Sequence, residues 1–151
     1  MRRESLEREI GEELAELQGA YDDSDRALAN RLGIGRTDLR CLDLIVRSGP
    51  CSATEVARKL GLTRGSVTTL IDRLERAGYA TRRPDPAHGK RVLVVPTPRL
   101  IELVEPLVEP RARAGREQLA AYSVGELLLI RTFLRQTRER HSEHAEKLLR
   151  D

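Results

Sequence analysis

Residues 53–70, ATEVARKLGLTRGSVTTL, contain the pattern that decides the fold. Their apolar side chains recur at the spacing of two successive short helices, each with one buried side: Val56, Leu60, Leu62, Val67 and Leu70. Ala57 is small where two such helices would cross closely, and Gly61 can take the positive φ of a tight turn. The stretch therefore predicts two steeply crossing helices, as a helix-turn-helix or as a plain αα-hairpin.

Hydroxyl side chains mark where these two helices begin. Ser52 and Glu55 have the spacing of a capping box, in which each side chain accepts a hydrogen bond from the backbone amide of the other residue. Thr63 can cap the second helix, and Gly78 is placed to end it after Ala77. Local residues are therefore expected to set both helix starts.

A long helix and a shorter one are predicted before this motif. The first runs from about residue 4 to 32 and is ended by Gly33. Its apolar stripe recurs in three- and four-residue steps: Leu6, Ile10, Leu14, Leu17, Tyr21, Leu28 and Leu32. Thr37 is expected to cap the second helix, which the residues Ser48-Gly49-Pro50 stop.

After Gly78 the apolar period changes from helical to extended. Short strands are predicted at residues 79–83 and 92–95, on either side of residues 84–91, PDPAHGKR. Together they form a two-stranded β-hairpin. The prolines stiffen this hairpin, and Gly89 allows it to turn.

Two helices are predicted to complete the chain. The first begins at Thr97-Pro98, runs to about residue 121 and should bend at its internal prolines. A second capping box, Ser123 with Glu126, begins the last helix, which runs to about Leu149. Along it, a set of residues falls seven apart, the spacing of a coiled-coil seam: Leu127, Leu134, His141 and Leu148.

The exposed face of the second motif helix is suited to DNA. Removing the apolar positions leaves mainly short hydrogen-bonding side chains and guanidinium groups: Arg64, Ser66, Thr68, Thr69, Asp72, Arg73 and Arg76. Short side chains let a helix approach the bases in a major groove, and arginine can bind guanine with two hydrogen bonds. Since a basic hairpin follows directly, the sequence predicts a mainly α winged helix-turn-helix protein that binds double-stranded DNA.

Composition excludes several other classes of protein. The chain has 151 residues, of which 39% are apolar, enough for one compact domain with a core. No stretch approaches the roughly 18 apolar residues of a membrane-spanning helix, and the first residues lack the apolar part of a signal peptide. We therefore expect a cytoplasmic protein without membrane contact. Cys41 and Cys51 fit neither a disulfide framework nor a CxxC metal site.

No catalytic motif is present in the sequence. Lys90 lacks the preceding glycine and the following Ser or Thr of a phosphate-binding loop. No histidine neighbours a serine or cysteine in a nucleophile motif, so only a pairing in space stays open. His141 and His144 could hold a metal across a dimer, but packing along the seam is favoured because no other ligand-rich segment is visible. We predict no enzyme, no cofactor and no metal.

Residues 27–45, ALANRLGIGRTDLRCLDLI, and residues 51–98, CSATEVARKLGLTRGSVTTLIDRLERAGYATRRPDPAHGKRVLVVPTP, resemble the MarR (multiple antibiotic resistance regulator) family of transcription factors. The resemblance implies a homodimer in which the N-terminal helix and the last two helices interlock. Two winged domains then meet a pseudo-palindromic operator. It also implies a repressor that a small lipophilic or aromatic effector releases from DNA, whereas other members of the family sense oxidants through cysteine.

The resemblance assigns DNA contacts to the recognition helix, at the following residues: Thr63, Arg64, Ser66, Thr68, Thr69 and Arg73. In the wing, Lys90 and Arg91 fall where the family usually has two arginines, one of which reaches into the minor groove, and Arg83 is a further basic candidate. Asp72 is expected to brace a nearby arginine, because phosphate would repel its carboxylate.

His88 stands where related wings have an aspartate that fixes the wing arginine. Two substitutes are open: Asp85 serves as the brace, or His88 itself contacts a phosphate. If His88 takes part in binding, the affinity for DNA should vary with pH where an imidazole titrates.

The predicted chain has three parts: residues 1–34, a dimerisation helix; residues 35–97, the DNA-binding domain; and residues 98–151, further dimerisation helices. The expected dimer contacts are Leu6, Ile10, Leu127, Leu134, His141 and Leu148. An effector pocket is expected beside Tyr21, Leu39 and Leu42.

Two alternatives stay open: a protein-binding winged helix without DNA binding, and a cysteine-based redox sensor. The first would carry acids or an apolar patch on its recognition face. The second would need a thiol whose pKa is lowered by a neighbouring cation, and only Arg40 is near Cys41 in sequence.

Overall fold

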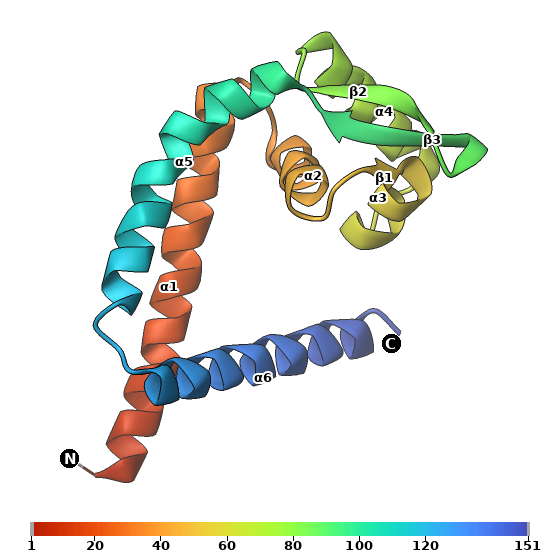
Figure 1. The fold of residues 1–151 in the computed structure, drawn as a ribbon. Coiled ribbons are helices and arrows are strands. Elements are labelled where there is room, and N and C mark those ends of the chain that lie inside the picture. The colour runs from red at the N-terminus through yellow and green to blue at the C-terminus, as the bar shows by residue number, and fades with distance from the viewer. Residues whose placement is uncertain (1, 151) are drawn as a thin grey trace. The chain divides into compact units, whose positions relative to one another are not determined.

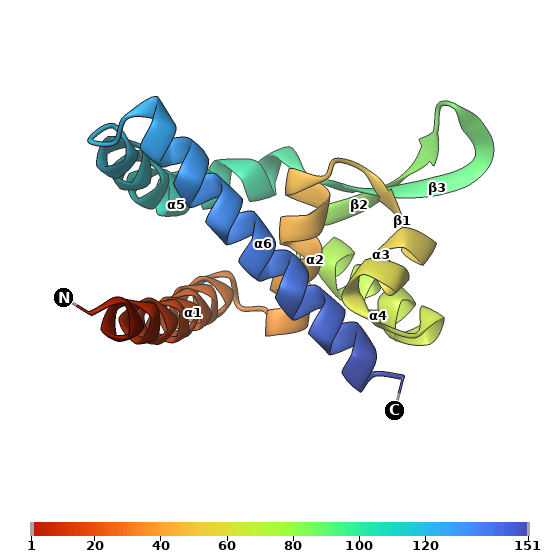
Figure 2. The same cartoon turned by 90° about the horizontal axis from the view of Figure 1, so that it is seen from below.

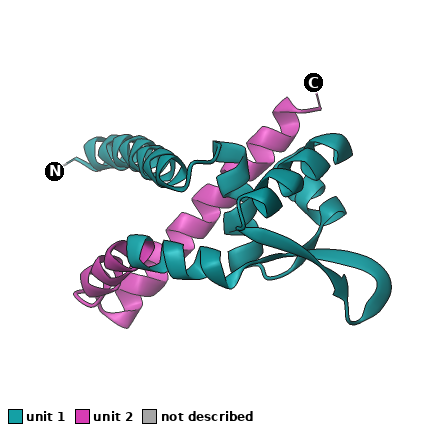
Figure 3. Ribbon diagram, turned by 90° about the horizontal axis from the view of Figure 1, so that it is seen from above, with its two compact units in different colours: residues 1–107 teal, residues 108–151 magenta. Residues whose placement is uncertain are grey.

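The structure, a computed structural model, describes residues 2–150. Its elements are α1 (Arg3–Leu32), α2 (Arg36–Arg47), β1 (Cys51–Ser52), α3 (Ala53–Leu60), α4 (Arg64–Arg76), β2 (Ala80–Asp85), β3 (His88–Pro96), α5 (Pro98–Leu119) and α6 (Val124–Leu148), as labelled in Figure 1. The chain forms two compact units, residues 1–107 and 108–151 (Figure 3).

The helices of the first unit begin and end mostly at the predicted residues. Gly33 ends α1 in the left-handed conformation, with φ of 68°. The capping box of Ser52 at the start of α3 is confirmed, and so is the Thr63 cap of α4. The prediction that Thr37 caps α2 is wrong. Helix α2 begins at Arg36, with Gly35 at its N-cap and no side-chain cap, so Thr37 lies inside the first turn.

The sheet contains three antiparallel strands in the order β1-β3-β2. The predicted hairpin is confirmed as β2 and β3, and the short strand Cys51–Ser52 adds a third member that was not predicted. Both hairpin strands are longer than expected, because pairing continues past Pro84 to Asp85 and His88 across a bulge. Pro84 is tolerated because β2 is an edge strand.

The core of the first unit lies where α2, α3, α4 and the sheet meet (Figures 1 and 2). Its most deeply buried side chains come from all of these elements and from α5: Cys41, Ile45, Val56, Val67, Leu70, Ile71, Leu74, Val94 and Leu100. The hydroxyl of Tyr79 donates a 2.9 Å hydrogen bond to the carbonyl oxygen of Leu32. This bond connects the end of α1 to the residue that precedes β2.

The second unit consists of the later part of α5 and all of α6. Pro106 and Pro110 do not interrupt α5. The predicted capping box of Ser123 and Glu126 is confirmed at the start of α6. Several large apolar side chains of α6 are exposed in the single chain: Leu128, Leu129, Phe133, Leu134 and Leu148. Within residues 2–150, no helix is both long enough and apolar enough to span a membrane.

We predict that Leu74→Ala lowers the free energy of unfolding by about 2–5 kcal/mol, because it leaves a cavity in the core. Leu74 is 0% exposed, whereas Val46 of α2 is 48% exposed. Val46→Ala is therefore the control, with an expected change within about 0.5 kcal/mol. Urea unfolding followed by circular dichroism measures both changes. Equal losses for the two variants would contradict this assignment of the core.

Candidate nucleic-acid interface

Helix α4 has one buried side and one exposed side. Val67, Leu70 and Leu74 are among the residues that face the core. The predicted contact residues Arg64, Thr68 and Thr69 are exposed. The Thr68 hydroxyl donates to the carbonyl oxygen of Arg64 and the Thr69 hydroxyl to that of Gly65, each at 3.1 Å. The exposed side therefore carries short side chains that lie close to the helix backbone.

The first turn of α4 uses two of the predicted contact residues to fix its own geometry. The Thr63 hydroxyl oxygen accepts from the Ser66 amide at 3.2 Å, and the two hydroxyl oxygens lie 2.8 Å apart. Just before this turn, Gly61 has φ of 67°, and the Leu62 amide donates to the Ala57 carbonyl oxygen at 2.9 Å. The predicted positive φ of Gly61 is thus confirmed, and the turn sets how α4 leaves α3.

Arg73 of α4 is bound to a buried acid of α2. Its Nε and Nη2 atoms lie 3.1 and 2.6 Å from the two carboxylate oxygens of Asp38. The Asp38 side chain is only 7% exposed, whereas that of Arg73 is 46% exposed. Hydrogen bonds from the Arg73 guanidinium to Asp38, followed by charge attraction, raise the pKa of Arg73. The pair connects α4 to α2 and leaves the arginine partly exposed at the surface.

A second ion-pair cluster connects α4 to the hairpin. Arg82 of β2 donates to Asp72 at 2.8 Å and also binds Glu75 through its guanidinium. Its backbone amide donates to Glu75 at 2.9 Å. The expectation that Asp72 braces an arginine is confirmed, and the braced residue is Arg82.

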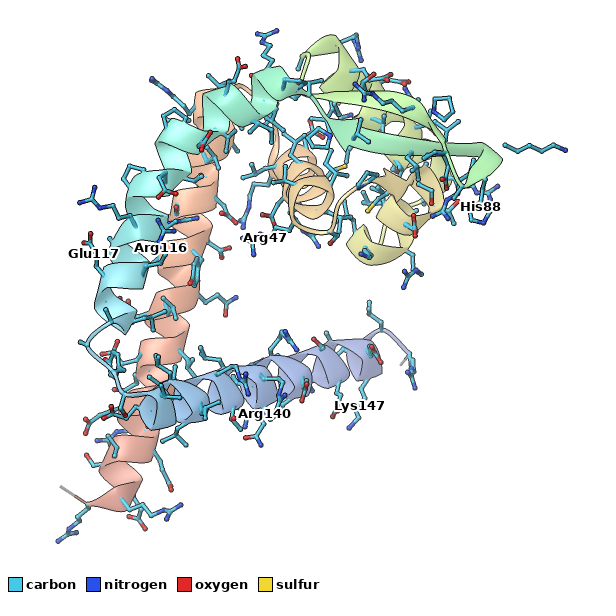
Figure 4. The ribbon with its side chains drawn as sticks, viewed as in Figure 1. Arg47, His88, Arg116, Glu117, Arg140 and Lys147 are labelled. Atoms are coloured by element: carbon cyan, nitrogen blue, oxygen red, sulfur yellow. The ribbon has the colours of Figure 1, made fainter. Side chains whose placement is uncertain are left out.

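In the wing, Asp85 lies within ion-pair distance of both His88 and Arg91. Asp85 is buried and accepts a 2.9 Å hydrogen bond from the Ala87 amide in the turn. His88 lies at the turn end of the hairpin (Figure 4), with Nδ1 3.5 Å from the Asp85 carboxylate. The Arg91 Nε lies 3.7 Å from the same oxygen. The 3.7 Å ion pair is in keeping with Asp85 as the substitute brace, and a DNA contact by His88 stays a prediction.

Arg91 also reaches the start of α3. Its Nη2 donates to Glu55 Oε2 at 2.6 Å, and the same oxygen accepts from the Ser52 amide at 2.7 Å. The Ser52 amide and the Arg91 guanidinium, in that order, lower the pKa of Glu55 to about 2. Glu55 thus stays ionised at neutral pH and holds the wing against the capping box of α3.

The remaining arginine and lysine residues predicted to bind DNA, unlike Arg73 and Arg91, form no ion pair within the described part of the chain. Arg64, Arg83 and Lys90 are all exposed, and none of them has an acid within ion-pair distance among residues 2–150. Sequence reasoning missed Asp38, and it identified Glu55 only as a capping residue. One signal for Asp38 was available, because it stands at the helical spacing of the apolar residues Leu42 and Ile45.

The residues predicted to line an effector pocket do not share one environment. Leu39 and Leu42 belong to the buried core, whereas Tyr21 is 56% exposed. The predicted dimer residues lie largely at the surface of the single chain. Leu6, Ile10, Leu134 and Leu148 are between 38% and 65% exposed, His141 is exposed, and Leu127 is half-buried. In the described part of the chain, no group of at least three His, Cys, Asp or Glu side chains could hold a metal ion.

The comparisons with known proteins agree on one family. A family model described as "MarR family" matches residues 32–91. An uncharacterized HTH-type transcriptional regulator of Bacillus subtilis, YcgE, is 37% identical over 123 residues, covering 82% of this chain and 80% of YcgE. The crystal structure of transcriptional regulator Tm0710 from Thermotoga maritima has a TM-score of 0.63 and 25% identity, covering 91% and 96% of the two chains.

The same fold is found in NadR, solved in complex with 4-hydroxyphenylacetate, with a TM-score of 0.61 and 22% identity over 85% of this chain and 91% of NadR. The exposed α4 surface, the adjoining hairpin and the matched relatives lead to the same conclusion. The chain belongs to the MarR family of winged-helix, DNA-binding transcriptional regulators.

Proposed function

We propose that the protein is a homodimeric repressor that binds a pseudo-palindromic operator and is released by a small-molecule effector. The observation that carries this proposal is the exposed side of α4, where Arg64, Thr68 and Thr69 lie opposite a fully buried side. A protein-binding winged helix would need acids or an apolar patch on this face. The family model and YcgE are those of transcriptional regulators, which supports a regulator rather than an enzyme.

In the proposed complex, α4 of each protomer lies in a major groove. Arg64 would bind guanine or phosphate, and the threonine hydroxyl oxygens would accept from base amino groups. The turn of the hairpin, with His88 and Lys90, would lie near the adjacent minor groove, and Arg83 would contact the backbone between them. Two such domains would read half-sites separated by about one helical turn, roughly 10 bp.

A second copy of the chain is the proposed partner of the exposed apolar residues. Leu6, Ile10 and Leu17 of α1 are between 38% and 45% exposed. On α6, Leu129 and Leu148 are 71% and 65% exposed. Long helices that leave so many large apolar side chains uncovered are typical of an interface. Residues 1–34 and 98–151 would therefore form the dimer, and residues 35–97 would bind DNA.

The effector is proposed to be a small aromatic or lipophilic molecule, and membership of the family supports this. NadR, which shares the fold, was solved in complex with 4-hydroxyphenylacetate, a small aromatic acid. Tyr21 offers an exposed aromatic ring, while Leu39 and Leu42 would have to be uncovered from the core. Binding to a conformation that DNA disfavours would shift the population away from the operator-bound form.

Redox sensing by cysteine is disfavoured. Burial, followed by the charge of Asp38 and the neighbouring Cys51, raises the pKa of Cys41 to about 12. Burial also raises the pKa of Cys51, whose thiol donates to the Gly49 carbonyl oxygen at 3.3 Å. Thiolate is the form that peroxide oxidises, so both thiols should be inert at neutral pH.

We predict that Arg64→Ala weakens binding to an operator selected from genomic DNA with the purified protein. The expected loss is about 1–3 kcal/mol, because a guanidinium contact in the major groove is lost. Fluorescence anisotropy with labelled duplex measures the affinity. Arg47→Ala is the control, since it removes the same charge from an exposed side chain that pairs with Asp43 on α2. If Arg64→Ala and Arg47→Ala bound with equal affinity, the proposed DNA surface would be incorrect.

Leu134→Glu should shift the protein from dimer to monomer, because it places a charge in the proposed apolar interface. Light scattering of the unaltered protein should give twice the chain mass of 17.0 kDa. Gln136→Glu, at an exposed position of the same helix, should leave the mass unchanged. A dimer that persisted in Leu134→Glu would argue against this interface.

Both cysteines should resist a thiol reagent such as Ellman's reagent at pH 7.5 in the folded protein and react after unfolding in urea. The raised pKa means that Cys41 thiolate becomes abundant only as the pH approaches about 12. Operator affinity should therefore be the same before and after treatment with hydrogen peroxide. Loss of binding that a reductant restores would favour the redox alternative.

A further inference from the structure

The basic side chains of the interface fall into two groups by their partners. Arg73 and Arg91 are each bound to a carboxylate of the protein, at 2.6 Å in both cases. Arg64, Arg83 and Lys90 have no such partner among residues 2–150. An internal carboxylate offsets the charge that an arginine would otherwise present to a phosphate.

Each paired arginine joins two elements that lie far apart in sequence. Arg73 connects α4 to Asp38 of α2, across 35 residues, and Asp38 is buried. Arg91 connects β3 to Glu55 of α3, across 36 residues. The first pair orients the recognition helix, and the second orients the wing relative to the helix-turn-helix.

The Arg91 contact continues into the backbone of the motif. The Glu55 oxygen that binds Arg91 also accepts from the amide and the hydroxyl of Ser52, at 2.7 and 2.9 Å. Ser52 in turn pairs with Leu93 of β3, two residues after Arg91. Arg91, Glu55, Ser52 and Leu93 thus form a connected set of contacts between β3 and the start of α3.

We infer that Arg73 and Arg91 are positioning residues, which hold the recognition helix and the wing in place, whereas Arg64, Arg83 and Lys90 are the residues that bind phosphate or base. This inference rests on the proposed DNA binding. It reassigns two arginines that sequence alone would count as DNA contacts. The side chain of Arg91 is 40% exposed, so a direct contact with DNA is sterically open to it, and the two roles differ in a measurable way.

The distinguishing measurement is the salt dependence of operator binding. Each phosphate contact adds about 0.9 to the slope of log affinity against log salt concentration. The double variant Glu55→Gln/Arg91→Ala removes an ion pair without changing the net charge, and glutamine keeps an oxygen that can accept from Ser52. If Arg91 only positions the wing, this variant should bind about tenfold or more weakly with the slope of the unaltered protein.

Lys90→Ala is the comparison, and it should lower the slope by about 1.8 for a dimer with two wings. Arg91→Lys supplies a second test, because lysine keeps the charge but loses the planar fork that spans Glu55 and Asp85. A positioning role predicts that Arg91→Lys also binds about tenfold more weakly at an unchanged slope. Thermal unfolding checks that each variant is folded.

The same design applies to the other pair through Asp38→Asn/Arg73→Ala, with Arg73→Lys as the milder variant if the double variant does not fold. A slope that falls by about 1.8 in Glu55→Gln/Arg91→Ala, as in Lys90→Ala, would overturn the inference while leaving DNA binding intact. If the unaltered protein bound no selected DNA, the proposed function itself would fail, and the inference with it.

Discussion

The burial of one side of α4 is the constraint on which the interface depends. Val67, Leu70, Ile71 and Leu74 are each no more than 1% exposed. Because the helical period is fixed, burying these positions forces Arg64, Thr68 and Thr69 to the surface. The left-handed Gly61 and the Thr63 cap then set where the helix begins. The surface proposed to bind DNA is thus a geometric consequence of the core.

Around this helix, ion pairs between arginines and carboxylates hold neighbouring elements together. Arg73 is held by Asp38, Arg82 by Asp72 and Glu75, and Arg91 by Glu55. These acids come from α2, α4 and α3, so the same contacts that neutralise the arginines also connect the elements. On our inference, a count of basic residues therefore overstates the number of side chains that bind phosphate. Where related wings have an aspartate, this wing has His88, and the carboxylates that pair with Arg91 come from Glu55 and Asp85.

Local features of the fold could be predicted from the sequence, because neighbouring residues determine them. The capping box of Ser52 and Glu55, the Thr63 cap and the left-handed Gly33 depend on residues within one helical turn. Thr37 was assigned wrongly because the N-cap is Gly35, which has no side chain to cap the helix and so leaves no capping signal in the sequence. The strand at Cys51–Ser52 was missed because two residues carry too little pattern, and its pairing is with Leu93 and Val94.

The candidate site was predictable only in part for the same reason. The residues on the face of α4 follow from its period, but the acidic partners of Arg73 in α4 and of Arg91 in β3 lie 35 and 36 residues away in sequence. Charge complementarity alone does not say which of the many acids in the chain pairs with a given arginine, because the fold decides which acid lies close to it. We propose that this face reads DNA as part of a dimer. Selection of genomic fragments by the purified protein, followed by sequencing, tests both parts of this proposal at once. We expect an enriched two-fold symmetric motif with half-sites about 10 bp apart, and selection without any enriched motif would show that the proposal is wrong.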